Sequence, residues 1–320
     1  RTLSRIPAVA GNNLSLTLDA KLQQVVEKAF GNRRGALVAI EPSTGGILAY
    51  VSMPNYDPNL FVDGIDSQSW QELNDSPEKP MVNRAINGTY PPGSTFKPYM
   101  ALAALELGKR RPEQTIFDPG FYNFGGHQFR DDKKGGHGSV NMYASIVQSC
   151  DTYYYMLAND LGIDNIAAFM GKFGFGSRTG VDIDGESEGV LPSQEWKKKR
   201  FKRPEQQKWY AGETISIGIG QGYNAYTPIQ LAQAMATLAN NGVMYRPHLV
   251  NYITDTRSGR KTYIEPQPIR TIALKPEHIE TIKQAMIGVN KEGTGARAFA
   301  GAEYVAAGKT GTAQVFSYKG

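Results

Sequence analysis

A serine and a lysine in the segment PPGSTFK have the types and the spacing that nucleophilic catalysis needs. Ser94 and Lys97 stand three residues apart, directly before the most apolar stretch of the chain. If a helix begins there, the two side chains share one face, and the serine hydroxyl lies near the positive end of the helix dipole. A serine is a weak nucleophile until a neighbouring base removes its proton, and a lysine can do so when burial lowers its pKa. The spacing therefore predicts a serine nucleophile with a lysine as its base.

Two more motifs support a catalytic role for this pair. The Ser-x-x-Lys spacing alone is weak, since it also occurs at Ser76–Lys79 and Ser258–Lys261, which are typical of surface turns. However, a Ser-x-Asp turn follows the first copy at Ser149–Asp151, between two helical patterns, and KTGT follows at Lys309–Thr312, inside a strand pattern. Ser-x-x-Lys, Ser-x-Asn/Asp and Lys-Thr-Gly in this order are typical of penicillin-binding proteins and serine β-lactamases.

The apolar periodicity predicts the elements that position these motifs. Residues 18–29 predict an amphipathic helix, and residues 36–54 predict a β-hairpin around PSTGG. Residues 54–90 are rich in Asn, Asp, Ser and Pro and predict loops and short turns. The middle of the chain predicts helices over residues 96–108, residues 143–162 in two pieces, residues 164–174, and residues 227–242 with Thr227 as N-cap, Pro228 at the first position and Gly242 as terminator.

The two ends of the chain are predicted to meet. A further helix is expected over residues 276–289, followed by a strand over residues 303–318. Strand patterns at both ends enclose the helical middle. The predicted fold is therefore of the α/β (α+β) class, a central antiparallel sheet flanked by helices with an inserted all-helical subdomain.

Composition excludes several other classes of protein. The chain has 320 residues, 40% of them hydrophobic, which is enough for one large globular domain or two smaller ones. Its single cysteine, Cys150, excludes an internal disulfide and a zinc cage of several cysteines. The longest apolar run, Tyr99–Leu105, is far shorter than the roughly 18 residues of a membrane span. These features exclude disordered, collagen-like and coiled-coil chains.

Six of the positive charges gather in KKKRFKR, residues 197–203, while the whole chain has a formal charge of +5. Such a run predicts a solvated surface that could contact an anionic glycan or a partner protein, and nucleic acid is not an expected partner. The aromatic residues around it are expected to anchor the loop to the core rather than to stack on sugar. They are Trp196, Phe201, Trp209 and Tyr210.

With its three motifs, the sequence resembles the transpeptidase domain of class B penicillin-binding proteins, most closely the penicillin-binding protein 2 group of the Gram-negative cell-elongation machinery. The strings RAINGTYPPGSTFKP, MGKFGFG, EWKKKRFKRP, SIGIGQGYNAYTPIQLA and AAGKTGTAQV carry this resemblance, which covers nearly the whole chain from Leu14. It implies a penicillin-binding protein/serine β-lactamase-like fold at the periplasmic face of the bacterial inner membrane.

The resemblance also implies a domain organisation. Residues 1–13 would be a linker from an N-terminal pedestal and membrane anchor, and residues 14–320 the transpeptidase domain. Its sheet subdomain would comprise about residues 14–60 and 245–320, and its helical subdomain about residues 90–242. Family members normally add further strands and a C-terminal helix after the KTGT strand, whereas this sequence stops at Gly320.

The resemblance implies a role for each residue of the first two motifs. Ser94 would attack the carbonyl between the terminal D-alanines of a peptidoglycan stem peptide and form an acyl-enzyme, with Lys97 as the general base. Ser149 would relay a proton to the leaving D-alanine. The family usually has Asn where this sequence has Asp151, although elongation-type members resemble it in carrying Asp. We expect Asp151 to pair with Lys97 or to be partly protonated; the alternative is a helix-capping aspartate without a catalytic part.

The third motif would hold the substrate. The resemblance implies that Lys309, Thr310 and Thr312 bind the substrate carboxylate, and that Gly311 is small so that the substrate backbone can lie alongside. The backbone N–H groups of Ser94 and Thr312 would form the oxyanion hole. An amine of a second stem peptide would then take the acyl group, and β-lactams would acylate Ser94 as substrate mimics.

Partners, cofactors and alternatives follow from the same resemblance. Expected partners are peptidoglycan stem peptides, β-lactam antibiotics, a membrane glycan polymerase and other proteins of the elongation complex, and the chemistry requires no cofactor. A serine β-lactamase or D,D-carboxypeptidase would share the first step, but residues 185–192 lack the Glu-x-x-x-Asn pattern of the best-known β-lactamases. A catalytically idle penicillin-binding sensor or scaffold is the alternative from a different functional class.

A possible structural zinc site involves the only cysteine. Asp118, Asp131, His137 and Cys150 supply a thiolate, an imidazole and two carboxylates, a plausible tetrahedral zinc set. Zinc there would clamp the turn of the second motif to the segment before it. The alternative is that Cys150 is a small buried apolar residue and the others are polar loop residues.

Overall fold

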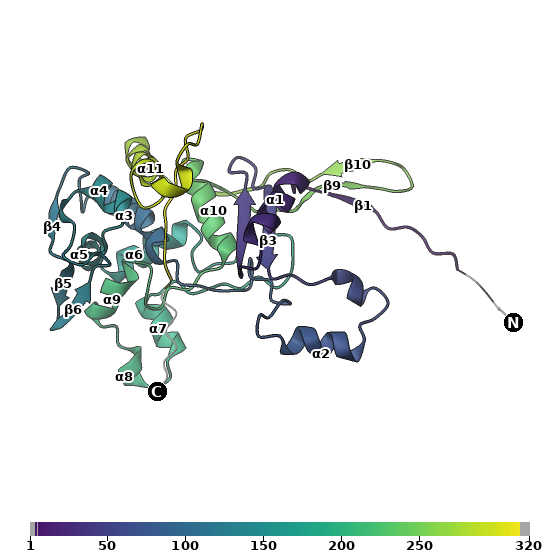
Figure 1. Cartoon of the computed structure of the whole chain (residues 1–320), viewed down its shortest axis with the longest axis horizontal. Coiled ribbons are helices and arrows are strands. Elements are labelled where there is room, and N and C mark those ends of the chain that lie inside the picture. The colour runs from purple at the N-terminus through teal and green to yellow at the C-terminus, as the bar shows by residue number, and fades with distance from the viewer. Residues whose placement is uncertain (1–3, 5, 314–320) are drawn as a thin grey trace.

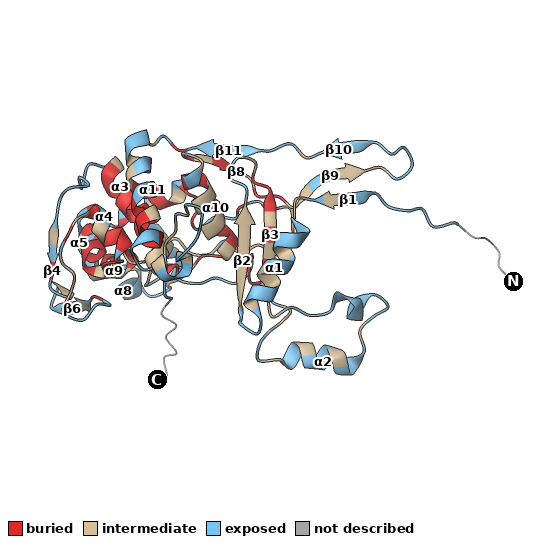
Figure 2. Ribbon diagram, turned by 45° about the horizontal axis from the view of Figure 1, so that its top comes forward, coloured by how far each residue is buried: buried red, intermediate tan, exposed pale blue. Residues whose placement is uncertain are grey.

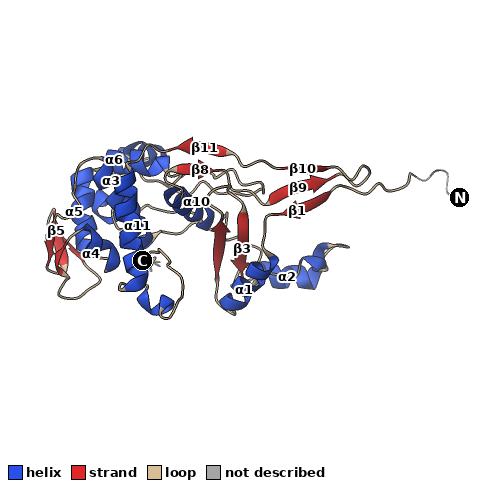
Figure 3. Cartoon of the chain, turned by 90° about the horizontal axis from the view of Figure 1, so that it is seen from above, coloured by secondary structure: helices blue, strands red, loops and turns tan. Residues whose placement is uncertain are grey.

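The computed structural model describes residue 4 and residues 6–313. Figure 1 shows an elongated arrangement, with most helices at one end and a three-stranded sheet towards the N-terminus. This sheet consists of β1 (Asn13–Leu16), β9 (Val250–Thr254) and β10 (Lys261–Tyr263). Colouring by secondary structure makes the same division visible from above (Figure 3). None of the helices within the described residues has both the length and the apolar character that a membrane crossing needs.

The N-terminal elements confirm the predicted helix and hairpin. Asp19 caps helix α1, where its carboxylate accepts hydrogen bonds from two backbone N–H groups of the first turn, at 2.9 and 3.0 Å. Strands β2 and β3 pair in antiparallel register, and β3 lies against the helix, where Gln23 hydrogen-bonds to the Tyr50 backbone. The bounds of this part are β1 (Asn13–Leu16), α1 (Ala20–Phe30), β2 (Gly35–Ile40) and β3 (Ile47–Met53).

Residues 54–90 contain two short helices, η1 (Pro58–Phe61) and α2 (Ser67–Asp75), with irregular chain around them. The prediction of loops and short turns is therefore right about the absence of a long element but misses α2. This helix begins at Asp66, whose side chain accepts from the Ser69 N–H group, and it buries no residue. A helix without a buried apolar stripe gives little periodic signal in the sequence.

The middle of the chain is mainly helical, as predicted, and the second motif lies between two helices. Its helices are η2 (Gly93–Phe96), α3 (Lys97–Glu106), α4 (Met142–Val147), α5 (Asp151–Leu161), α6 (Ile163–Lys172), α7 (Gln194–Arg200), α8 (Pro204–Gln207), α9 (Ala211–Ile217) and α10 (Pro228–Ala239). Thr227 and Gln230 form a capping box at the start of α10, so the predicted N-cap is confirmed. The helix ends at Ala239, before the predicted terminator Gly242.

The prediction of an all-helical subdomain is wrong between α3 and α4. This segment forms two small antiparallel sheets, β4 with β7 and β5 with β6. Each strand has only three or four residues, which is too short for a clear alternating pattern. The bounds are β4 (Ile116–Asp118), β5 (Phe121–Phe124), β6 (His127–Arg130) and β7 (Gly138–Val140).

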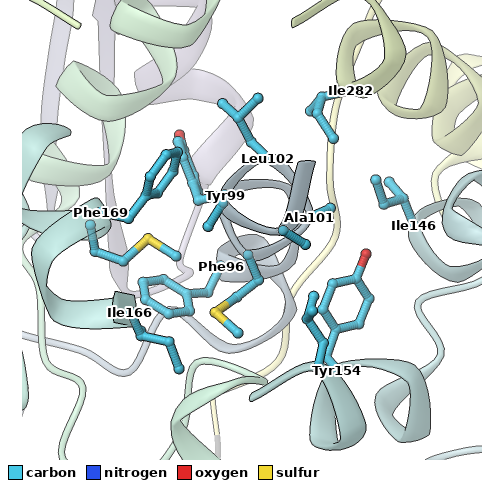
Figure 4. Close-up of a cluster of buried hydrophobic side chains, with 14 of the residues drawn as sticks. Phe96, Tyr99, Ala101, Leu102, Ile146, Tyr154, Ile166, Phe169 and Ile282 are labelled. Carbon is cyan, nitrogen blue, oxygen red and sulfur yellow. The ribbon is translucent and has the colours of Figure 1, made fainter. Parts of the chain in front are cut away.

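Helix α3 runs through the centre of the main core (Figure 4). Side chains from α4, α5, α6 and α11 surround it; those labelled in Figure 4 are Ile146, Tyr154, Ile166, Phe169 and Ile282. Every residue of α3 up to Leu105 is buried, which explains why the sequence is apolar all round rather than striped. Burying each large apolar side chain stabilises the fold by about 1.5–3 kcal/mol. Figure 2 shows this concentration of buried residues in the helical part.

The two ends of the chain meet, but in separate short sheets rather than in one central sheet. Strand β1 pairs with β9, where Asn13 lies opposite Thr254, and Ile47 donates its N–H to His248 O at 3.0 Å. Strand β8 pairs with β11, and the hairpin β2–β3 forms a sheet of two strands. The C-terminal elements are β8 (Val243–Tyr245), β9 (Val250–Thr254), β10 (Lys261–Tyr263), β11 (Pro268–Thr271), α11 (Pro276–Lys291) and η3 (Ala296–Phe299).

The strand predicted over residues 303–318 is absent from its described part, residues 303–313, and the remainder lies outside the described residues. A strand requires a hydrogen-bonded neighbour. Here the backbone meets helix α11 instead: Gly308 donates its N–H to Met286 O at 3.0 Å, and the Asn290 side chain donates to Ala306 O at 3.1 Å. The segment that leads into the third motif thus lies against helix α11.

The basic run is only partly a solvated surface, since Lys197 is buried, contrary to prediction. Its Nζ lies 2.5 Å from a carboxylate oxygen of Glu213 and donates to Lys208 O at 2.7 Å, which satisfies the buried charge. The other five cations of the run are exposed. The predicted aromatic anchoring is confirmed for three side chains that contact the Tyr223 ring, namely Trp196, Phe201 and Trp209.

Candidate active site

Ser94 lies in the short helix η2, which leads directly into α3. Gly93 has φ +55°, a conformation that favours glycine, and its N–H donates to Gly220 O at 3.0 Å. Lys97 is the first residue of α3, so the two side chains of the first motif share the start of this helix, as predicted. The Ser94 side chain is half-buried, whereas that of Lys97 is completely buried.

Lys97 joins the first motif to the second. Its Nζ donates to Ser149 O at 2.7 Å and to Ser149 Oγ at 3.2 Å, and it lies 2.5 Å from Asp151 Oδ1. A buried ammonium group is tolerated only when such oxygens replace its hydration. The predicted pairing of Asp151 with Lys97 is therefore present.

The Ser149 hydroxyl lies between two lysines. Lys97 Nζ and Lys309 Nζ both donate to Ser149 Oγ, the latter at 2.9 Å. Ser149 has φ +60°, an uncommon conformation for a residue with a side chain, and this turn connects α4 to α5. Burial and the nearby charge of Lys97 lower the pKa of Lys309 to about 7, although Asp151 and Asp132 oppose the shift. Lys309 therefore changes charge near neutral pH.

Few hydrogen bonds hold the third motif. Thr310 Oγ1 lies 2.6 Å from Thr294 Oγ1, and Gln221 Nε2 donates to Thr312 O at 3.0 Å. A Cβ atom on Gly311 would lie 2.8 Å from Thr95 Cγ2. Gly311 is thus required to be small by the packing of the segment against η2, in addition to any need of the substrate.

All three motifs line one cavity of about 290 Å³. Its walls are formed by Ser94, Asp132, Ser149, Asp151, Ile219, Gln221, Thr294, Thr310, Gly311 and Thr312. Sequence reasoning gave no role to Ile219, Gln221 and Thr294. Gln221 lies in one of the strings that carried the family resemblance, but no chemical motif marked it. Asp132, which also lines the cavity, was given no role either.

The two backbone groups predicted for the oxyanion hole come from adjacent segments. A Cβ atom on Gly93 would lie 3.2 Å from Thr312 N and 2.5 Å from Thr312 O. The peptide units of Thr312 therefore lie directly against the turn that carries Ser94. Donors from a helix start and an extended segment can converge on one oxygen in such an arrangement.

The four predicted metal ligands gather beneath the second motif. Potential ligand atoms of Asp118, Asp131, His137 and Cys150 all lie within 4.8 Å of one another. His137 Nδ1 is 2.7 Å from Asp118 Oδ2 and 3.4 Å from Asp131 Oδ1. Cys150 Sγ is 3.5 Å from Asp118 Oδ2 and 3.6 Å from Asp131 Oδ2.

This donor set fits zinc. Tetrahedral bonds of 2.0–2.3 Å place nitrogen, oxygen and sulfur ligands about 3.3–3.8 Å apart, which agrees with three of the four distances. The His137–Asp118 distance is that of a hydrogen bond and would lengthen on metal binding. The side chains are buried, and burial raises the pKa of the Cys150 thiol in the protein without metal. Asp131 also accepts the backbone N–H of Thr152 at 2.8 Å, which links the cluster to α5.

Comparison with known proteins identifies the family. Residues 35–320 match the penicillin-binding protein transpeptidase domain. The chain belongs to this family, as its three motifs predicted.

Particular relatives are peptidoglycan D,D-transpeptidases. The chain is 45% identical to MrdA of Escherichia coli K12, in an alignment that covers 100% of this chain and 50% of that protein. It is 46% identical to MrdA of Acinetobacter baumannii, covering 99% and 47%. The chain thus spans about half the length of these relatives.

Solved structures support the fold. The structure of Pseudomonas aeruginosa PBP2 in complex with WCK 5153 superposes with a TM-score of 0.88 at 45% identity, covering 96% of this chain and 69% of that one. The PBP2 chain in the complex with MreC from Helicobacter pylori gives 0.83 at 34% identity, covering 94% and 55%.

Proposed function

We propose that this chain is the catalytic domain of a peptidoglycan D,D-transpeptidase that cross-links stem peptides during cell-wall elongation and is inhibited by β-lactams. One observation carries the proposal: the Ser149 hydroxyl lies between Lys97 and Lys309, on the wall of a cavity that also contains Ser94. Proton transfer and carboxylate binding can both occur in such a site.

In the first step, Ser94 Oγ attacks the carbonyl carbon between two D-alanines. Lys97, whose Nζ lies 2.5 Å from Asp151 Oδ1, acts in its neutral amine form, accepts the hydroxyl proton and becomes an ammonium group. The oxyanion is stabilised by the backbone N–H groups of Ser94 and Thr312. The peptide bond then breaks, Ser149 relays a proton to the departing D-alanine amine, and an ester on Ser94 remains.

In the second step, an amine of another stem peptide attacks this ester. A new amide bond forms, the ester C–O bond breaks, and a proton from the amine returns to Ser94 Oγ. Lys309, Thr310 and Thr312 hold the donor's terminal carboxylate during the first step, because a cation and two hydroxyl groups suit a carboxylate.

The test is intact-mass measurement of the protein during incubation with benzylpenicillin over hours, with Ser94→Ala as the control. The expected result is a single stable adduct that the Ser94→Ala variant does not form. An adduct that disappears within seconds would indicate a β-lactamase. The absence of any adduct on the wild-type protein would favour a binding domain without catalysis.

Localisation and partners belong to the same proposal. The relatives' names support a role in peptidoglycan synthesis, which would place this domain at the periplasmic face of the inner membrane. The solved complex of a relative with MreC, and a peptidoglycan synthase complex that matches at a TM-score of 0.85, support partners within the elongation machinery and a membrane glycan polymerase.

We further propose that Asp118, Asp131, His137 and Cys150 hold a structural zinc ion. The fit of the donor set and its burial support this. The ion would supply no chemistry to the acyl transfer. It would fix the turn that carries Ser149 to the small sheets before α4, since Cys150 belongs to that turn.

Elemental analysis of protein purified without chelator or His-tag tests the zinc site. We expect about one equivalent of zinc, lost in Cys150→Ser and retained in His127→Ala, which changes an exposed histidine of the neighbouring strand β6. Thermal unfolding should show the loss of stability in Cys150→Ser only. Less than about a tenth of an equivalent in the wild-type protein would overturn the assignment.

A further inference from the structure

The dipeptide Gly220–Gln221 contacts both segments that supply the oxyanion hole. Ser94 and Thr312 are far apart in the chain, and no helix or strand among the described residues joins them directly. The loop after helix α9 contacts both segments. It hydrogen-bonds to the first segment through its backbone and to the second through a side chain.

The contact with the first segment depends on glycine. Gly220 O accepts the N–H of Gly93, the residue before Ser94, at 3.0 Å. Gly220 has φ +72°, and a Cβ atom there would lie 2.2 Å from Gly93 O. Since no side chain fits, the two backbones meet directly, and the position of the Ser94 turn follows that of the loop.

The contact with the second segment depends on Gln221. Its Nε2 donates to Thr312 O at 3.0 Å. Within residues 6–313, no other side chain hydrogen-bonds to the Thr312 backbone, and the segment has no strand neighbour in this range. The Gln221 amide is therefore the main polar restraint on the peptide unit beside the predicted oxyanion donor.

The loop itself is well anchored. Gln221 donates its N–H to Ser216 O at 3.1 Å, and its carbonyl accepts from Asn224 Nδ2 at 2.9 Å. Helix α9, which precedes the loop, is tied to α7 by the ion pair between Glu213 and the buried Lys197. Both ends of the dipeptide are thus fixed before it reaches the site, which is what a positioning element needs.

We propose that Gln221 is a positioning residue for acylation, which holds Thr312 against the Ser94 turn so that their two N–H groups converge on one oxygen. The inference rests on the proposed function. Gln221 touches no reacting atom in this role. Its effect reaches the reaction through the Thr312 peptide, and it should therefore change the rate of acylation rather than the affinity for the ligand.

The test compares three variants of the full chain. Gln221→Met keeps the length of the side chain but removes the donor, Gln221→Glu places a second acceptor against Thr312 O, and Gln284→Met changes an exposed glutamine of α11 as the control. Stopped-flow acylation by a chromogenic cephalosporin separates the first-order acylation rate constant from the dissociation constant Kd. Removing one oxyanion donor outright costs about 10²–10³ in rate, so loosening its support should cost less.

We expect the acylation rate constant to fall about tenfold in Gln221→Met and further in Gln221→Glu, with Kd within about twofold of the wild-type value and thermal unfolding unchanged. Gln284→Met should match the wild-type protein. Hydrogen exchange of the amides in residues 305–313 should be faster in both Gln221 variants. An unchanged acylation rate constant in both Gln221 variants would overturn the proposal. A rise in Kd without a fall in the acylation rate constant would overturn it as well. If the wild-type protein formed no adduct, the proposed function would fail, and unchanged hydrogen exchange would separately overturn the role of Gln221.

Discussion

The cavity lined by the three motifs has one wall that is part of the main core and one wall that lies against the surface of that core. Lys97 is fully buried, and Ser149 is 7% exposed. In contrast, Tyr304 and Val305, which lead into the third motif, are 69% and 71% exposed. The first wall is fixed by the packing around α3, whereas the second is held by a few hydrogen bonds to α11, Thr294 and Gln221.

This difference separates two requirements of the reaction. Proton transfer needs its groups within hydrogen-bond distance at all times, and burial in a packed core provides this. Substrate binding has to admit and release a peptide, and a segment with few restraints can open locally at low cost. Substitutions in the two walls should therefore differ in their effects on stability and on acylation.

The largest effect is expected for Lys97→Met. It removes the proposed base, so the acylation rate by benzylpenicillin should fall about 10³-fold. It also leaves Asp151 without its cation, which should lower the free energy of unfolding by about 3 kcal/mol. Intact-mass kinetics and urea unfolding measure the two effects. The double variant with Asp151→Asn should recover stability but not acylation; recovery of the rate as well would mean that Lys97 acts only through folding.

The next largest effect is expected in a comparison of a buried residue beside the first wall with an exposed residue beside the second. Leu102→Ala leaves a cavity beside α3 and should lower the free energy of unfolding by about 2–5 kcal/mol. Val305→Ala, in the exposed segment, should change it by less than about 0.5 kcal/mol. Urea unfolding followed by tryptophan fluorescence gives both values. Similar losses for the two variants would contradict the division into a core wall and a surface wall.

A pH dependence should follow from Lys309, whose pKa is about 7. Only its cationic form attracts a carboxylate, so the Kd for benzylpenicillin should rise towards tenfold per pH unit above about pH 7. Lys309→Arg, which stays charged, should flatten the curve. The stability of the fold should change in the opposite direction and increase with pH. In the unfolded chain the lysine has a pKa near 10.4, so between about pH 7 and 10 it binds more protons than Lys309 does in the folded protein. The contribution of Lys309 to the free energy of unfolding therefore rises across this range.

The smallest effect is expected for Thr294→Val, which removes the hydroxyl partner of Thr310. The bond is exposed, and its loss should raise Kd for benzylpenicillin by about fivefold, equivalent to about 1 kcal/mol. Thermal unfolding should be unchanged. An effect as large as that of Lys97→Met would show that the third motif is as strongly constrained as the core.

The sequence predicted the core wall well because its signals are local. A Ser-x-x-Lys spacing at a helix start, a turn between two helices and an apolar run are all visible within a few residues. The four potential metal ligands were also grouped correctly, although Asp118, Asp131 and His137 come from a strand and loops that were not predicted. Their chemical type, rather than any periodicity, indicated the cluster.

The surface wall could not be predicted in the same way, because it depends on contacts between distant segments. The segment before Thr312 has the pattern of a strand, yet helix α11 supplies its hydrogen-bond partners. The contact of Gln221 with Thr312 joins residues that share no motif. The burial of Lys197 likewise depends on Glu213, which lies outside the basic run and gives no sign of a pairing in the sequence.

The direct backbone contact between Gly93 and Gly220 has a consequence for the evolution of antibiotic resistance. Neither position has room for a side chain, since a Cβ atom would come within 2.5 Å of Thr312 O in one case and 2.2 Å of Gly93 O in the other. If the proposed function holds, a substitution there would disturb the reaction with stem peptides and with β-lactams alike, because both would use the same oxyanion donors. Selection by β-lactams is therefore expected to leave Gly93 and Gly220 unchanged. It should act on side chains around the cavity, where drug and natural substrate differ in shape.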